Sequence, residues 1–149
     1  MSYYSSVIAR PNADGFAGRY VHSASQPNYV ITRLLQLYRG PFKRDLDAMQ
    51  RFLIDDHPGG WSRLGDDPTI DTGWSDANRA NRTGFTCYCH GDRHETHPPF
   101  TQDSDGPDVE WLYVLTNTGI EVSQVDWSND EADETFTWRH HKHVSWPAA

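Results

Sequence analysis

The clearest indicator of the fold is the stretch Glu110-Trp111-Leu112-Tyr113-Val114-Leu115-Thr116-Asn117-Thr118-Gly119-Ile120-Glu121-Val122-Ser123-Gln124-Val125. Its first half is rich in aromatic and β-branched residues, which are typical of a strand. The turn residues Asn117-Thr118-Gly119 bring the chain back as an antiparallel neighbour. The apolar alternation slips between Val122 and Val125, which predicts a bulge near Ser123-Gln124.

A second pair of strands is predicted at the N-terminal end of the chain. The segment from Tyr3 to Arg10 alternates as a strand does, and Pro11-Asn12-Ala13-Asp14-Gly15 is a strong turn signal. The segment from Phe16 to His22 then returns beside the first strand. The sequence therefore predicts an N-terminal β-hairpin.

Two helices are predicted to follow this hairpin. The first begins at Ser25-Gln26-Pro27, where proline suits the first helical position, and ends at Arg39-Gly40-Pro41. The second begins near Lys43-Arg44-Asp45 and ends at His57-Pro58-Gly59-Gly60. Apolar residues recur at helical spacing in both, namely Ile31, Leu34, Leu35, Tyr38, Leu46, Met49, Phe52 and Leu53.

The last predicted strand runs from Thr135 to Trp146. Strict alternation places Thr137, Arg139, His141 and His143 on one side, and Phe136, Trp138, His140, Lys142 and Val144 on the other. Arginine and histidine on one face form a cationic stripe that suits an anionic small molecule. The alternative is that these side chains pair with nearby carboxylates on an exposed face. The candidate ligand-binding residues are His22, Arg139, His141 and His143.

These elements predict one α+β domain over residues 1–149. Its N-terminal hairpin and helical pair precede a set of antiparallel strands that form one sheet, with the helices on one face. The central segment, about 61–109, shows no sustained period and is predicted to be irregular. A segment of this length without regular structure is typical of a functional loop or of an undetected short element.

The central segment contains every cysteine of the chain and three of its eight histidines, in Cys87-Tyr88-Cys89-His90-Gly91-Asp92-Arg93-His94-Glu95-Thr96-His97. Thiolate and imidazole are the ligands that zinc prefers. If residues 85–89 form a strand, both thiols lie on one face of it. The candidate zinc ligands are Cys87, Cys89, His90, His94 and His97. The alternatives are that the cysteines are buried core residues and that the histidines belong to a solvated loop.

Charge and hydropathy limit the classes of partner. The formal net charge is −8, from 13 basic and 21 acidic residues. Such a surface disfavours direct nucleic-acid binding, whereas it is compatible with solubility, a basic partner or imitation of a nucleic acid. No window is apolar enough to span a membrane, and the N-terminus lacks a signal-peptide pattern. We expect a soluble cytoplasmic protein without membrane association.

Separated short blocks of the chain resemble a family of short uncharacterised proteins of actinobacteria and their phages. These blocks are Val7-Ile8-Ala9-Arg10, Gly18-Arg19-Tyr20-Val21-His22-Ser23, Cys87-Tyr88-Cys89-His90-Gly91-Asp92 and Glu110-Trp111-Leu112-Tyr113-Val114. Relatives carry Asp-Gly-Tyr-Pro after the second strand, whereas Ala24-Ser25-Gln26-Pro27 keeps only the proline here. The resemblance implies an intracellular bacterial or phage protein, and it implies no reaction.

Three functional hypotheses follow. The first is a non-enzymatic binding protein, of phage or prophage origin, that recognises a small anionic ligand or a host protein and uses the Cys/His segment as a structural clip. The second is a metal-dependent hydrolase that uses the Cys/His cluster, with Glu95 as the base. The third is an acidic inhibitor that imitates nucleic acid, which requires the carboxylates of 103–108 or 126–134 on one face.

Overall fold

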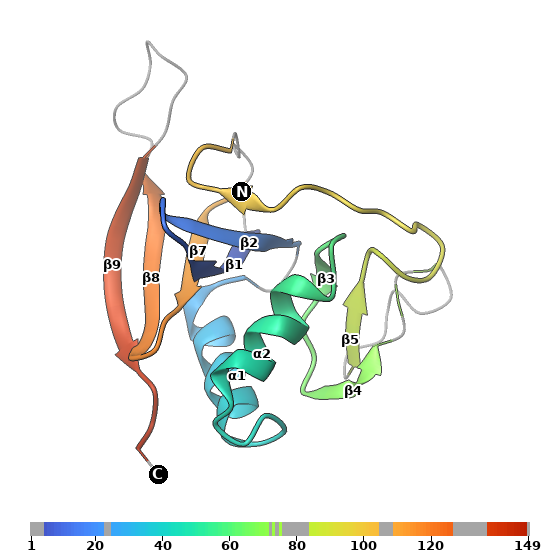
Figure 1. Ribbon diagram of the computed structural model, residues 1–149, viewed down its shortest axis with the longest axis horizontal. Coiled ribbons are helices and arrows are strands. Elements are labelled where there is room, and N and C mark those ends of the chain that lie inside the picture. Colours follow the sequence, from blue (N-terminus) through green and yellow to red (C-terminus); the bar gives the residue numbers. More distant parts are fainter. Residues whose placement is uncertain are drawn as a thin grey trace.

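The structure is a computed structural model that describes residues 5–22, 25–71, 73, 75, 84–104, 109–126 and 137–148. A mixed sheet of many strands and two short helices form an α+β fold, and this confirms the predicted class (Figure 1). The helices lie against the middle of the sheet, between the strands at its two ends.

The described residues form a sheet of nine strands, in the order β4-β5-β3-β2-β1-β7-β8-β9, with β6 paired to β2. Its central strands are β2 and β1, from the start of the described chain, and β7, which lies far from them in the sequence. The bounds are β1 (Ser6–Pro11), β2 (Phe16–Val21), β3 (Trp61–Arg63), β4 (Asp67–Asp71), β5 (Gly84–Cys87), β6 (Phe100–Thr101), β7 (Trp111–Leu115), β8 (Gly119–Asp126) and β9 (Thr137–Ser145).

Both antiparallel and parallel pairings occur in this sheet. β1 and β2 pair antiparallel, as do β7 with β8 and β8 with β9. The pairs β1–β7, β2–β3 and β4–β5 are parallel, which the sequence did not predict. A parallel neighbour needs a crossover connection, and the helical segment between β2 and β3 supplies one. Strand periodicity carries no information about this choice of partner.

Helix α1 (Pro27–Arg39) begins with proline at its first turn and ends at Gly40, whose N–H donates to Gln36 O (2.9 Å). Helix α2 (Leu46–Gln50) begins at Asp45, whose carboxylate accepts a hydrogen bond from Ala48 N (3.0 Å). Such a cap satisfies a backbone donor that has no partner within the helix. The helix continues as a π-helical turn, η1 (Arg51–Asp55), so that the second predicted helix stops just before His57.

The strands β1 and β7 are buried on both faces. The first core lies between the sheet and the helices, and it contains Ile8 and Tyr113 together with Leu34 and Leu53. The second core lies against the alternate residues of the same strands, Val7, Ala9 and Leu112, and also contains Phe16 and Val109. Burial on both faces explains why β7 is the clearest strand signal in the sequence.

Four short strands, β3 to β6, lie within the central segment that sequence periodicity left irregular. Each has five residues or fewer, which is too short for a two-residue period to be recognised. Residues 72, 74, 76–83 and 105–108 of this segment lie outside the described residues.

The predicted bulge near Ser123 has a different form from the one expected. The register between β8 and β9 shifts between Val122 and Ser123, because these residues pair with Lys142 and His140 and leave His141 as the extra residue. The extra residue is therefore in β9. Val125 breaks the apolar alternation of β8 because it pairs with Trp138, which packs against the second core.

Truncation of Leu34 tests the first core. Leu34→Ala is expected to lower the free energy of unfolding by about 3 kcal/mol, because the side chain is fully buried and its loss leaves a cavity. The matched control is Leu35→Ala in the same helix, where the side chain is only half-buried and less than half of that effect is expected. Urea denaturation measures both, and equal losses would contradict the described orientation of α1.

Candidate ligand cavity and metal-binding group

His57, Cys87 and His90 form a compact group of metal-ligand side chains. Each offers one ligand atom, and these atoms all lie within 4.8 Å of one another. His57 follows η1, whereas Cys87 ends β5 and His90 follows three residues later. His57 and Cys87 are buried and His90 is exposed. Within the described part of the chain, this is the one cluster of three or more such residues that meets this distance.

Cys89 lies beside this group. The Nδ1 atom of His90 is 3.0 Å from Cys87 Sγ and 3.5 Å from Cys89 Sγ. The two cysteines are not joined by a disulfide. Both thiols therefore approach the same imidazole nitrogen, although β5 ends at Cys87 and a strand through residue 89 is not formed.

The His57 ring is fixed in orientation by its neighbours. Its Nδ1 atom lies 2.7 Å from Phe52 O, and since a carbonyl can only accept, Nδ1 carries the proton. In the neutral ring the lone pair is then on Nε2. The ring centroid is 4.9 Å from that of Phe52 and 4.3 Å from that of Trp61. A hydrogen bond to a backbone carbonyl is the usual support of a histidine that binds a metal.

The structure brings together three of the five predicted metal ligands, Cys87, Cys89 and His90. His97 instead lies 3.1 Å from Glu95 Oε1 through its Nε2 atom, and His94 is exposed at a left-handed backbone position with φ of 50°. Sequence analysis assigned His57 only to a helix end, so it missed this member of the group. The available signal was a lone histidine between Asp55-Asp56 and Pro58-Gly59-Gly60, thirty residues before Cys87.

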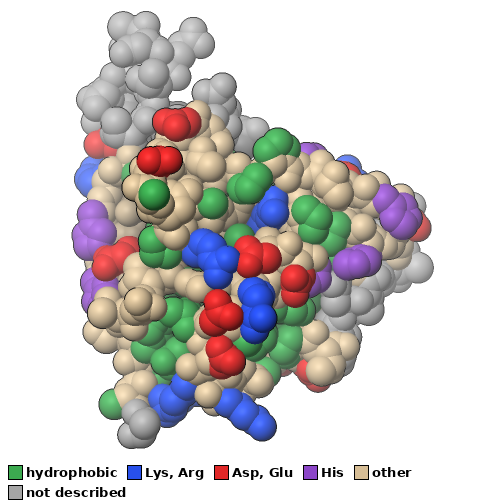
Figure 2. All heavy atoms as spheres, in the orientation of Figure 1, with side chains coloured by type: hydrophobic (Ala, Val, Ile, Leu, Met, Phe, Trp, Pro, Cys, Tyr) green, Lys and Arg blue, Asp and Glu red, His purple; other side chains and the backbone are tan. Residues whose placement is uncertain are grey.

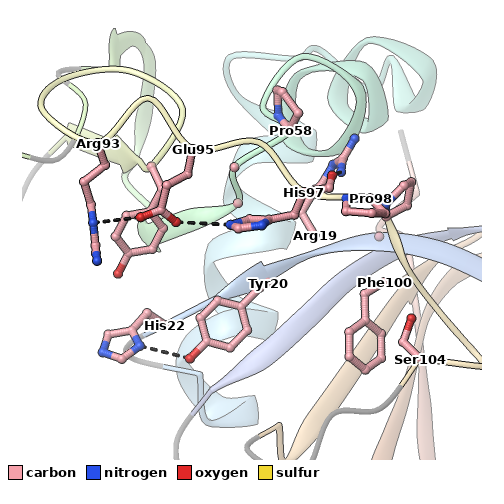
Figure 3. Close-up of a pocket in the computed structure, with 15 residues that line it drawn as sticks. Arg19, Tyr20, His22, Pro58, Arg93, Glu95, His97, Pro98, Phe100 and Ser104 are labelled. Carbon is pink, nitrogen blue, oxygen red and sulfur yellow. Dashed lines mark hydrogen bonds and ion pairs between the residues drawn. The ribbon is translucent and has the colours of Figure 1, made fainter.

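A cavity of about 590 Å³ lies between β2 and the loop that follows β5. Figure 3 shows Arg93, Glu95 and His97 on the loop above it, and Tyr20 and His22 below, on or next to β2. Its apolar lining is formed by Tyr20, Tyr88, Phe100 and three prolines, Pro58, Pro98 and Pro99. The volume falls in the range of about 300–1,000 Å³ that is typical of small-molecule sites.

One wall of the cavity carries a row of charged and polar groups. Arg93 Nε is 2.8 Å from Glu95 Oε2, and the guanidinium carbon of Arg93 lies 5.1 Å from the centre of the Tyr88 ring. The other oxygen of Glu95 lies 3.1 Å from His97 Nε2. Glu95 is the acidic side chain in the described lining, beside Arg19, Arg93, His22 and His97. The lining as a whole therefore contains more basic and imidazole side chains than carboxylates.

The opposite wall is fixed by hydrogen bonds from β2. Tyr20 Oη and His22 Nδ1 share a hydrogen bond of 3.0 Å. Arg19 donates to Ile54 O through Nε (2.8 Å) and to His97 O through Nη1 (3.0 Å), so it joins β2 to η1 and to the loop. Burial lowers the pKa of the Arg19 guanidinium, and the nearby charges of Asp55 and Cys89 act in the opposite direction. Arg19 thus links this wall of the cavity to η1 and to the loop after β5.

Two glycines allow the walls to approach closely. A Cβ atom added at Gly59 would lie 2.5 Å from Glu95 O and 2.7 Å from Cys89 N. Gly60 has φ of +78°, a backbone conformation that favours glycine. The residues 58–60 also bind the loop through its backbone, because Tyr88 N donates to Gly60 O (3.1 Å) and His97 N donates to Pro58 O (2.9 Å).

The predicted cationic stripe on β9 is not continuous. His140 Nε2 and His143 Nδ1 bind the two oxygens of Glu121, at 2.9 and 2.8 Å, although strict alternation placed these histidines on opposite sides. The prediction is wrong because His141 is the extra residue of the bulge, and its ring lies 5.4 Å from that of Trp111. Of the four predicted ligand-binding residues, the described cavity lining includes His22, while Arg139, His141 and His143 lie on β9.

Charges of both signs are interleaved on the surface over α2 (Figure 2). Arg10 lies 2.7 Å from Asp55 Oδ2, and Arg51 lies 3.3 Å from Asp47 Oδ2. Histidines gather at two separate edges of the same face, over β9 and over the loop after β5. The carboxylates of 105–108 and 127–134, on which nucleic-acid imitation depends, lie outside the described residues.

Comparison of the chain with protein-family models, with curated proteins and with solved structures gives no match. The resemblance to the actinobacterial and phage family thus stays a prediction. None of the helices in the described part of the chain is long and apolar enough to cross a lipid bilayer.

The contacts of Glu121 predict a pH dependence of stability. Hydrogen bonds from His140 and His143 lower the pKa of the Glu121 carboxyl from its ordinary value of 4.5. Its stabilising contribution is therefore present above pH 4.5 and is lost as the pH falls through the lowered pKa. Glu121→Gln is expected to reduce the free energy of unfolding by less than about 1 kcal/mol at neutral pH, because the pair is partly exposed. Urea denaturation of both proteins should show this difference shrink as the pH falls below 4.5, and a constant difference would contradict the assignment.

Proposed function

We propose that the protein binds a small anionic molecule that contains at least one ring, in the cavity between β2 and the loop after β5. The observation that carries this proposal is the lining of the cavity, where aromatic rings and prolines surround a row of basic and imidazole groups. Apolar walls supply most of the binding free energy, and a few polar groups select the ligand. The concave shape favours a small molecule over a host protein.

Arg93 is the group best placed to recognise a negative charge. Its guanidinium lies over the face of Tyr88, and its Nε atom lies 2.8 Å from Glu95 Oε2. A guanidinium offers five N–H donors in a planar fork and can bind more than one acceptor. Arg19 is less suitable because its Nε and Nη1 atoms already donate to backbone carbonyls. The ring of the ligand would lie against Tyr20 and Phe100.

Zinc is the metal that we propose for the His57 group, since the cysteine and histidine donors match its preference. None of these donors is in the described lining of the cavity, although their neighbours Pro58 and Tyr88 are. A hydrolytic metal needs an open coordination position that faces the substrate. The arrangement therefore favours a binding protein with a structural metal over the metal-dependent hydrolase.

Replacement of Arg93 tests the proposed recognition of the anion. The probe is 8-anilinonaphthalene-1-sulfonate, which combines aromatic rings with one negative charge, and its neutral analogue N-phenyl-1-naphthylamine serves as the reference. Arg93→Gln is expected to weaken sulfonate binding by about threefold to tenfold, the loss of a partly exposed charge-assisted hydrogen bond. Binding of the neutral analogue should not change. Isothermal titration calorimetry measures both affinities.

The matched control for this substitution is Arg139→Gln on β9, which the cavity does not include. It should leave the affinity for both probes as in the wild type. If Arg139→Gln weakens sulfonate binding and Arg93→Gln does not, the ligand site is on β9 and the proposal is wrong.

Replacement of Glu95 should have the opposite effect. Glu95→Gln keeps the shape of the side chain but removes the carboxylate that lies 2.8 Å from Arg93 and would repel an anion. The affinity for the sulfonate is expected to rise by about twofold to fivefold, which is typical of a screened charge near the surface. The same calorimetric titration checks this, and a weaker affinity would show that Glu95 positions Arg93 for binding.

A further inference from the structure

We infer that one zinc ion bound by His57, Cys87, Cys89 and His90 joins residues 57–60 to the loop after β5, two segments that line the cavity, so that zinc occupancy controls ligand binding. The metal site itself is independent of the proposed function, whereas the control of binding rests on it. Neither His57 as a ligand nor this coupling follows from the sequence.

The distances from His90 Nδ1 to the two thiols suit a tetrahedral site, although Cys89 lies outside the group of ligand atoms within 4.8 Å of one another and would move inward when the metal enters. Zn–S bonds of about 2.3 Å and Zn–N bonds of about 2.0–2.1 Å place sulfur and nitrogen ligands about 3.5 Å apart. Cys89 Sγ and His90 Nδ1 already lie 3.5 Å apart. Cys87 Sγ and His90 Nδ1 are 3.0 Å apart, so these two atoms would separate by about 0.5 Å when the metal enters. His57 completes the set with its Nε2 atom.

Cys89 decides whether the protein fills the fourth coordination position of the zinc ion. With His57, Cys87 and His90 alone, the fourth position would remain for water or a substrate. With Cys89, all four positions belong to the protein, as in structural zinc sites. On binding, each thiol loses its proton to solvent, and the two thiolates balance the charge of Zn²⁺. A neutral centre is the form that the fully buried Cys87 can accommodate at least cost.

The four ligands come from two segments that line the cavity, residues 57–60 and the segment around Tyr88, and not from the wall that β2 forms. His57 directly precedes Pro58, Gly59 and Gly60, which line the cavity on one side. Cys87, Cys89 and His90 flank Tyr88 and directly precede the loop that carries Arg93, Glu95 and His97. A metal shared by these segments acts as a covalent cross-link beside the cavity.

Two backbone hydrogen bonds and the adjoining β3–β5 pairing also join these segments beside the cavity. The bonds run from Tyr88 N to Gly60 O (3.1 Å) and from His97 N to Pro58 O (2.9 Å). Loss of zinc removes a restraint on both chain neighbours of Tyr88, and Tyr88 lines the cavity and lies against the Arg93 guanidinium. We therefore expect removal of zinc to weaken both the charged and the neutral probe, in contrast to Arg93→Gln, which weakens only the charged one.

Elemental analysis and native mass spectrometry of the full chain test the metal site. One zinc per chain is expected in the wild type. Both His57→Asn and Cys89→Ser are expected to abolish zinc binding. Cys89→Ser is the less disruptive substitution because the Cys89 side chain is only half-buried, so a loss of zinc there is not explained by misfolding. The matched control is His94→Asn, which keeps a residue that tolerates the left-handed backbone and should retain zinc. A wild-type protein that binds added zinc more weakly than about 1 µM would overturn the site, since structural zinc sites bind far more tightly.

Calorimetric titration of the two naphthalene probes tests the coupling. Zinc removal by a chelator, and Cys89→Ser, are each expected to weaken both probes by at least about tenfold, and re-addition of zinc should restore the wild-type affinity. Unchanged affinities after zinc removal would overturn the coupling and leave the proposed function in place. If neither probe binds the zinc-loaded protein, the proposed function fails together with the coupling, while the zinc content still decides the metal site.

Discussion

Burial of Trp61 is the constraint on which the rest of this structure depends. The side chain is fully buried, and its indole N–H donates to Leu53 O (2.9 Å). Its backbone pairs with Val21 of β2 on one side and with Cys87 of β5 on the other. The tryptophan therefore fixes the end of the helical segment against two strands at one point. Because an unpaired indole N–H would be costly in the core, the hydrogen bond specifies this position as well as the packing does.

The same residue sets the geometry of both candidate sites. Its ring lies 4.3 Å from that of His57, and its backbone oxygen accepts a hydrogen bond from His22 N (2.9 Å). One contact orients a histidine of the candidate metal group, and the other positions a histidine of the cavity. The metal group and the cavity are thus two sides of one junction between η1, β2 and β5, where short segments are held by specific hydrogen bonds.

The net charge of the chain is a poor guide to the chemistry of this junction. The formal charge is −8, yet the described cavity lining places Arg19, Arg93, His22 and His97 beside one carboxylate. Elsewhere, several acidic side chains are paired with arginine or histidine, as Asp55 is with Arg10 and Glu121 is with His140 and His143. The electrostatic field at a site depends on which charged side chains lie there. The net charge of the whole protein affects mainly its solubility and its encounter with partners.

The sequence by itself determined the local elements: the α+β class, the start of α1 at Pro27 and the strong strand at β7 all follow from propensity, capping and periodicity. It also identified Cys87, Cys89 and His90 as a possible metal segment, because these donors are adjacent in the chain. Tertiary structure alone brought His57 to them across thirty residues and paired β1 with β7 in parallel. The pairing of β9 with β8 also interrupts the predicted alternation of side chains on β9, because His141 is an extra residue at a bulge. Sequence periodicity predicts which face of a helix or strand is apolar. Which other element packs against that face depends on segments that are distant in the sequence and meet only in the folded protein.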